Sequence, residues 1–206
     1  MAVYVLGVST SPRAGSNSDV LLRKALTGAG EAGAQTEYLR LADYKVGPCM
    51  ECNSCYATGR CVLNDDYPQI LQKILDTDHL IIASPIFYMS VCAQAKMLID
   101  RAQCLWAKKN IIGRDIFFQP RDRRAMVIAV GGSKSIKQFE SVRLTMKTYF
   151  DSLQFRYRAG LYVNNVDTAG AVEKNPKALQ EAFRLGKLLA TANAPLPAKP
   201  VEIELT

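Results

Sequence analysis

The stretch AVYVLGVSTSPRAGSNSD, residues 2–19, joins a short apolar run to a loop rich in serine. The run is rich in valine and ends directly before serine, proline and glycine, which is typical of a buried strand that leads into a loop. Residues 18–30 then place apolar side chains at helical spacing, and Gly28, Gly30 and Gly33 mark the end of that helix. A strand, a loop and a helix in this order are the first unit of an α/β fold.

The same alternation continues along the chain. We expect four further strands, at residues 34–41, 79–85, 125–130 and 155–163. We expect four further helices, at residues 67–77, 92–104, 136–153 and about 176–192. Three of the strands are apolar throughout, which favours a parallel sheet covered by helices on both faces. The sequence predicts a flavodoxin-like, doubly wound α/β fold with a five-stranded parallel sheet in the order 2-1-3-4-5.

Ligands in such folds bind beyond the carboxyl ends of the strands. The loop at residues 9–19 offers hydroxyl groups, the cation Arg13 and the amide Asn17, and it leads into a helix N-terminus that favours an anion. It matches neither the Walker A pattern nor the GxGxxG fingerprint. These features predict a monophosphate site, although Ser16 or Ser18 could instead simply cap the helix.

Two further loops follow strands at the same edge. Residues 84–91 carry Phe87 and Tyr88, whose aromatic surface could line a planar heterocycle, although Phe87 could also pack in the core. Residues 130–135 contain paired glycines, which allow the backbone to approach a ligand closely. Taken alone, the glycine pair is a weak signal, because glycine is common in turns.

Four motifs occur together in this chain: STSPRAGSNSD (9–19), PCMECNSCYATGRCVLNDD (48–66), ASPIFYMSVCAQAKMLIDR (83–101) and VGGS (130–133). In combination they resemble the iron-sulfur flavoproteins, within the NAD(P)H-dependent FMN reductase group of flavodoxin-like proteins, from residue 2 to about 190. The resemblance implies bound FMN, with its phosphate at Ser9, Ser11, Arg13, Ser16, Asn17 and Ser18. It implies a flavin ring held by Pro85, Ile86, Phe87, Tyr88, Gly131, Gly132 and Ser133. It also implies a homodimer or homotetramer.

The resemblance further implies that Cys49, Cys52, Cys55 and Cys61 bind a [4Fe–4S] cluster. Their spacing, C-x2-C-x2-C-x5-C, lies within the pattern of that branch, and four thiolates are what a cubane cluster needs. Zinc is an alternative, but structural zinc sites usually separate two Cys-x2-Cys pairs more widely. A loop that holds no metal is another alternative, whereas disulfides do not suit a reducing cytosol.

The remaining candidate residues have simpler interpretations. We expect Cys92 and Cys104 to be small buried side chains on one helix. The only histidine, His79, is interpreted as structural, because one histidine cannot supply a set of metal ligands. Asp100 and Arg101 match the end of this helix in the family, where they either anchor the helix or contact another subunit.

The predicted domain organisation is one FMN-binding domain at residues 1–193 and a proline-rich tail at residues 194–206. The domain contains the cysteine-rich loop, residues 47–64, and an insertion, residues 105–123, with a β-like segment at 114–118. We expect the insertion to pack on a subunit interface or to screen the flavin. We expect the tail to be loosely held, or else to embrace a neighbouring subunit.

The 206 residues carry a net charge of +7, which suits either a solvated face or an acidic partner. No nucleic-acid-binding motif is recognisable. No apolar run reaches the roughly 18 residues that span a bilayer, and the N-terminus lacks the features of a signal peptide. We therefore expect a cytoplasmic protein that binds neither nucleic acid nor a membrane.

By resemblance, the expected function is electron transfer by an FMN-dependent oxidoreductase. A ferredoxin-like donor would supply electrons through the cluster, and a small acceptor (oxygen, peroxide or a quinone) would take them from FMN. No catalytic acid or base is assigned. The alternative is an NAD(P)H-dependent FMN or quinone reductase without a cluster. A third hypothesis is a redox-sensing protein whose cluster controls a partner.

Overall fold

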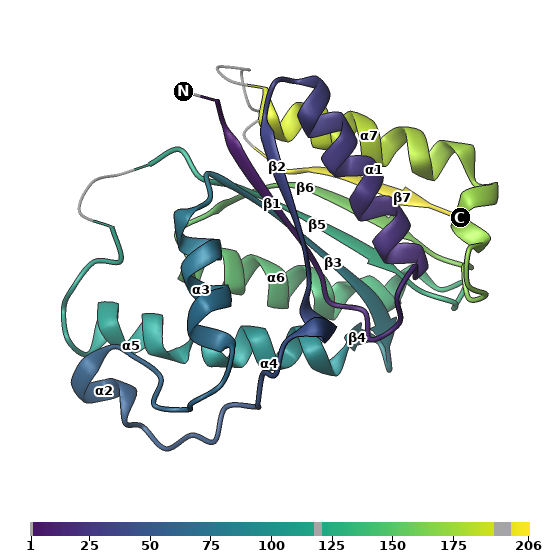
Figure 1. The fold of residues 1–206 in the computed structure, drawn as a ribbon. Helices are drawn as coiled ribbons and strands as arrows, with labels where there is room; N and C mark the ends of the chain where they lie inside the picture. Colours follow the sequence, from purple (N-terminus) through teal and green to yellow (C-terminus); the bar gives the residue numbers. More distant parts are fainter. Residues whose placement is uncertain (1, 118–120, 192–198) are drawn as a thin grey trace.

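A parallel sheet forms the centre of the molecule in the computed structural model, which describes residues 2–117, 121–191 and 199–206 (Figure 1). The strands are β1 (Tyr4–Ser9), β2 (Gln35–Arg40), β3 (His79–Phe87), β4 (Ser90–Val91), β5 (Arg124–Val130), β6 (Arg156–Val163) and β7 (Val201–Leu205). The helices are α1 (Asn17–Glu31), α2 (Cys55–Thr58), α3 (Tyr67–Asp76), α4 (Ala93–Arg101), α5 (Gln103–Asn110), α6 (Glu140–Ser152) and α7 (Pro176–Ala190). Short 3-10 turns are η1 (Leu41–Asp43), η2 (Ile136–Phe139) and η3 (Ala171–Lys174).

The flavodoxin-like α/β class is confirmed, but the prediction of five strands in the order 2-1-3-4-5 is wrong. The sheet has seven strands in the order β2-β1-β3-β5-β6-β7, with β4 paired to β3. All pairs are parallel except β3–β4, which is antiparallel. The two strands that the prediction omits are β4, which has only two residues, and β7, which lies in the expected tail.

Helices cover both faces of the sheet, as predicted (Figure 1). One face packs against α1 and α7 through a cluster that includes Leu22, Leu26 and Leu185. The other packs against α3, α4, α5 and α6 through a second cluster that includes Ile70 and Leu98. Because β1, β3 and β5 contribute side chains to both clusters, the central residues of these strands form continuous apolar runs.

Three local predictions differ from the structure. The first part of the expected insertion continues a helix, α5, and residues 111–117 form no strand, whereas residues 118–120 lie outside the described part of the chain. The cysteine-rich loop contains a short helix, α2. Residues 201–205 are not loosely held, because they pair with β6 as β7, whereas residues 194–198 of the tail are outside the described ranges.

Candidate functional site

Loops that follow β1, β3, β5 and β6 surround a pocket of about 270 Å³ at the carboxyl end of the sheet. It is lined by Ser11, Pro12, Arg13, Ser16, Asn17, Ser18, Pro85, Ile86, Phe87, Val130, Gly132, Val166 and Asp167. β1 lies between β2 and β3, so the strand order runs in opposite directions on its two sides. The pocket lies at this switch in the strand order. The structure therefore brings together most of the residues that the family resemblance assigns to FMN.

Four of those predicted residues do not line the pocket: Ser9, Tyr88, Gly131 and Ser133. Ser9 is buried at the end of β1, and Tyr88 is fully exposed to solvent. Gly131 faces Gln138, whose side-chain amide donates to the carbonyl oxygen of Ser133 over 2.7 Å. These residues shape the loops around the pocket.

The N-terminus of α1 forms the polar end of the pocket. The Ser16 side chain caps the helix by accepting from the N–H of Asp19 over 3.3 Å. Within the described residues, the N–H groups of Asn17 and Ser18 have no hydrogen-bond partner. Free N–H groups at a helix start, beside hydroxyl groups and Arg13, are features that favour an anion. Helix capping and anion binding are thus both compatible with this loop.

The loop after β6 contributes pocket residues that the sequence analysis missed. The Asn17 side chain donates to the carbonyl oxygen of Thr168 over 2.8 Å and accepts from the N–H of Val172 over 3.2 Å. These bonds fasten the loop to α1 and bring Asp167 to the pocket wall. A Cβ on Gly132 would lie only 2.9 Å from the Asp167 carboxylate, so only glycine fits there without a shift. No motif in the sequence marks this loop.

The turn between β3 and β4 holds two non-glycine residues in a left-handed conformation. Tyr88 has a φ of 48° and Met89 a φ of 63°, which is uncommon for side chains of this size. The Ser141 hydroxyl of α6 donates to the carbonyl oxygen of Met89 and so supports the turn. Phe87 lines the pocket and is partly exposed, and the neighbouring Tyr88 is fully exposed to solvent.

A second site gathers the cysteine-rich loop against α4 and α5. All four predicted cysteine ligands line one small cavity, of about 30 Å³, together with Arg101, Gln103 and Cys104. Across the described ranges, no three histidine, cysteine or acidic side chains are arranged to hold a single metal ion. The thiols nevertheless converge on one volume, with Cys49 and Cys52 exposed and Cys55 and Cys61 half-buried.

The thiols of this cavity have different environments. Burial, followed by the neighbouring thiolates, raises the pKa of Cys55. Backbone and side-chain hydrogen bonds from Ser54 lower the pKa of the exposed Cys52. Cys104 is buried, as predicted, and its burial raises its pKa. Its position in the wall of the cavity was not predicted, because it lies 43 residues beyond Cys61 in the sequence.

Arg101 and Asp65 form a buried ion pair beside the cavity. Nη1 of Arg101 lies 2.7 Å from the Asp65 carboxylate, and Nε donates to the Cys61 sulfur over 3.1 Å. Burial acts to raise the pKa of Asp65, but hydrogen bonds from Arg101 and from two backbone N–H groups outweigh it and lower that pKa. Of the two interpretations of Arg101, the structure supports anchoring.

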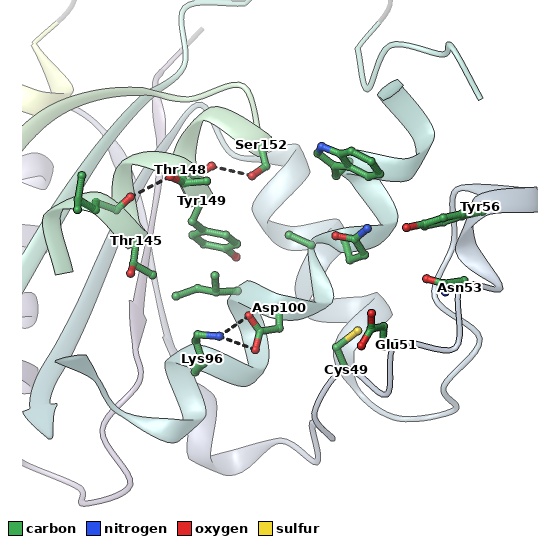
Figure 2. A pocket seen from close by; sticks show the side chains of 15 residues that line it. Cys49, Glu51, Asn53, Tyr56, Lys96, Asp100, Thr145, Thr148, Tyr149 and Ser152 are labelled. Atoms are coloured by element: carbon green, nitrogen blue, oxygen red, sulfur yellow. Dashed lines mark hydrogen bonds and ion pairs between the residues drawn. The ribbon is translucent and has the colours of Figure 1, made fainter. Parts of the chain in front are cut away.

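A groove of about 730 Å³ adjoins the cysteine cavity (Figure 2). Cys49, Glu51 and Tyr56 lie along one side, and Tyr149 of α6 lies on the other. The groove contains none of the residues assigned to FMN, so it is separate from the pocket at the end of the sheet. It opens the cysteine cavity to solvent at Cys49.

Comparison with known proteins adds a family context. The model of a family described as NADPH-dependent FMN reductase matches residues 3–163. An iron-sulfur flavoprotein of Methanocaldococcus jannaschii is 39% identical over 131 residues, which cover 64% of this chain and 63% of that protein. The chain therefore spans less than two thirds of that relative.

Two other similarities extend further along the chain. The Bacillus subtilis protein YwqN, whose name describes an NAD(P)H-dependent FMN-containing oxidoreductase, is 30% identical, with 91% of this chain and 97% of that protein covered. The solved NAD(P)H:quinone oxidoreductase of Methanothermobacter marburgensis has a TM-score of 0.67 at 17% identity, covering 92% of this chain and 98% of that chain. That likeness supports the fold.

Among the described residues, no helix has the length and apolar character needed to cross a membrane.

Proposed function

The chain belongs to the NADPH-dependent FMN reductase family, and we propose that it is an electron-transfer flavoprotein with FMN and a [4Fe–4S] cluster. The predicted class, an FMN-dependent oxidoreductase, agrees with the family match and with the relative YwqN. The observation that carries the proposal is the convergence of four cysteine side chains on one cavity in a fold that also has a pocket suited to FMN.

The residues of the pocket at the end of the sheet fit FMN. Hydroxyl groups, free N–H groups and Arg13 suit a phosphate, and the apolar surface of Pro85, Ile86 and Phe87 suits a planar ring. Gly132 also lines this pocket, and its lack of a side chain leaves space for the Asp167 carboxylate in the pocket wall. Ser11, Ser16, Asn17 and Ser18 would hold the phosphate, whereas Ser9, Gly131 and Ser133 would act only through the shape of the loops.

The donor set of the cysteine cavity fits a cluster better than a single ion. Four thiolates around one zinc ion would all lie about 2.3 Å from one point. Each thiolate of a four-iron cluster binds a different iron, so the four sulfurs lie farther apart. All four thiols line the same cavity, and no three of the described histidine, cysteine or acidic side chains are placed to hold one ion, so we take the cluster as the proposed occupant. Cys49, Cys52, Cys55 and Cys61 would be the ligands.

Helix α4 links the two sites. Its N-cap residue, Cys92, donates its N–H to Ser84 over 3.2 Å and its thiol to the carbonyl oxygen of Thr10 over 3.1 Å, beside the FMN pocket. Its last residue, Arg101, touches the cysteine cavity. Nine helical residues span about 14 Å. When bound, a cluster would supply one-electron transfer and FMN both one- and two-electron transfer.

The proposed direction of transfer follows from access and charge. Cys49 is exposed at the groove of Figure 2, so a donor can approach the cluster from solvent. A net charge of +7 suits an acidic, ferredoxin-like donor. A small acceptor such as oxygen, peroxide or a quinone would meet the flavin at the open mouth of its pocket. A homodimer or homotetramer in the cytoplasm is part of this proposal.

The second candidate function is an NAD(P)H-dependent FMN or quinone reductase without a cluster. It is favoured by the similarity to YwqN, which covers nearly the whole of both chains. In that case the cysteine-rich loop would have only a structural role, and NAD(P)H would donate a hydride directly to the flavin. The two candidates differ in their electron donor.

The test compares the oxidation rates of reduced ferredoxin and of NAD(P)H by anaerobically purified protein. We expect ferredoxin to be the faster donor, and Cys55→Ala to abolish that rate while FMN stays bound. Cys104→Ala is the comparison within the same cavity, because its thiol lines the cavity wall but is not a proposed ligand. A faster rate with NAD(P)H that Cys55→Ala leaves unchanged would support the second candidate.

A further inference from the structure

Arg101 directs a buried guanidinium at the sulfur of one proposed ligand. Its side chain is fully buried, and Nε donates to Cys61 Sγ over 3.1 Å. Nη1 donates to the carbonyl oxygen of Gly47 over 3.1 Å. The guanidinium also lies over the ring of Tyr67, 4.4 Å from its centre. These contacts leave Arg101 little freedom to turn away from the cysteine.

Asp65 connects Arg101 to both ends of the cysteine-rich loop. It accepts from Nη1 over 2.7 Å and from Nη2 over 3.1 Å, which is a two-bond pairing with the guanidinium. It also accepts from the N–H of Gly47 over 2.9 Å and from that of Tyr67 over 3.1 Å. Gly47 precedes the first cysteine and Tyr67 follows the last, so one ion pair ties both ends of the loop to α4.

Stability alone gives a weak reason for a charged pair at this place. Taking two charges out of water costs several kcal/mol for each ion, and apolar residues of similar volume often stabilise a protein as well or better. A guanidinium that gives one of its N–H groups to a sulfur is better explained when that sulfur is a thiolate ligand, because a charged acceptor roughly doubles the strength of a hydrogen bond.

We propose that Arg101 is a positioning residue of the iron-sulfur site. It holds the Cys61 sulfur and the two ends of the cysteine-rich loop in place before the cluster binds, and it keeps its hydrogen bond to that sulfur afterwards. Asp65 orients the guanidinium for both tasks. This inference rests on the proposed function, since it needs the cysteines to bind a cluster.

The experiment uses the whole 206-residue chain, loaded anaerobically with iron salts and sulfide. The variants are Arg101→Lys, Arg101→Met and Asp65→Asn, with Lys96→Met as the control. Lys96 also lies on α4 and is also paired with an acidic residue, but its pair is exposed and does not touch the cysteines. The readouts are iron retained against a chelator, the reduction potential of the bound cluster, FMN content and the melting temperature without metal.

We expect Arg101→Met and Asp65→Asn to weaken iron retention about 10- to 100-fold, which is typical when a partner of a metal ligand is removed. Arg101→Lys should keep FMN and the fold but lower the reduction potential. The lysine ammonium lacks the planar set of donors of a guanidinium, so the hydrogen bond to the Cys61 sulfur would be lost. Without this bond the reduced cluster, which carries more negative charge, is less stable. Lys96→Met should match the wild type in iron retention and potential.

The outcomes separate this inference from the function on which it rests. Wild-type protein that takes up no iron contradicts the proposed cluster itself. Wild-type loading with unchanged retention and potential in Arg101→Lys and Asp65→Asn overturns the role of Arg101 and leaves the cluster intact. A lower melting temperature with no change in potential would make Arg101 only a structural residue. If Arg101→Met loses FMN through misfolding, the two other variants decide the matter.

Discussion

The side chain of Arg13 stands at the mouth of the FMN pocket, and Arg101 stands at the cysteine cavity. The sequence pointed to Arg13, because it lies within a loop whose hydroxyl groups are all close to it in the chain. The sequence could not show that Arg101 pairs with Asp65, because 36 residues separate them. Each of these charged residues, taken alone, is indistinguishable from one exposed to solvent. Local motifs therefore pointed to the pocket proposed for the flavin, whereas the support of the cysteine site depends on residues far apart in the sequence.

A first prediction concerns the phosphate end of the FMN pocket. Arg13→Gln removes a cation from an anion site, so the dissociation constant for FMN should rise about tenfold or more, the equivalent of a charged hydrogen bond. Riboflavin lacks the phosphate, and its affinity should stay the same. Titration by flavin fluorescence measures both constants.

Arg23→Gln is the matched control for this change. Arg23 lies on α1, and its side chain pairs with Asp19 away from the pocket lining. An equal loss of affinity for FMN and riboflavin in Arg13→Gln would show that Arg13 does not contact the phosphate.

A second prediction concerns His79, the only histidine of the chain. Its burial at the start of β3, followed by the charge of Arg124, lowers its pKa from 6.5. The unfolded chain therefore binds more protons below pH 6.5, so this contribution to stability is present above that pH and is lost as the pH falls. His79→Gln should show a smaller loss of stability between pH 7 and 5.

The measurement is the urea midpoint of both proteins across this pH range. The imidazole signal of the wild type can be followed by proton NMR without ambiguity, because there is a single histidine. An imidazole that titrates at or above 6.5 would contradict the burial argument.

At the scale of elements, the pattern of apolar residues determined which strands could be predicted from the sequence. Strands such as β3 and β5 are buried on both faces, so their residues form continuous apolar runs. β7 was missed because its outward residues, Glu202 and Glu204, interrupt the apolar pattern after a proline-rich segment. Its contact with Arg143 of α6, which binds both glutamates, arises only from the tertiary structure.

A third prediction tests the packing of α1 against α7. A Cβ on Gly28 would overlap the backbone carbonyl of Phe183, and one on Gly186 would overlap that of Ala25. Gly28→Ala should therefore cost about 1–3 kcal/mol, because the two helices must separate. Thermal unfolding of the purified protein measures this loss, at about 2–4 °C for each kcal/mol.

Gly30 provides the matched control on the same helix. A Cβ there meets no atom within 4 Å, so Gly30→Ala should stabilise the protein by about 0.5–1 kcal/mol through a better helix propensity. If both alanine variants shift the melting temperature in the same direction, the close approach of α1 and α7 does not determine the result.

At the scale of the whole molecule, one sheet supports the two proposed sites, which lie at opposite ends of α4. The pocket proposed for FMN follows from the parallel topology, since the ends of β1, β3, β5 and β6 meet at one edge. The cysteine site depends on a long loop folding back onto α4, and Arg101 and Asp65 fasten it there. The proposed electron transfer requires both sites to be filled in one chain.

The most direct measurement is the content of iron, acid-labile sulfide and FMN per chain in protein purified without oxygen, recorded with its absorbance spectrum. About four irons, four sulfides and one flavin per chain are expected for a [4Fe–4S] site beside an FMN site. Flavin with no iron would contradict the proposed cluster and leave an NAD(P)H-dependent reductase as the better description of this protein.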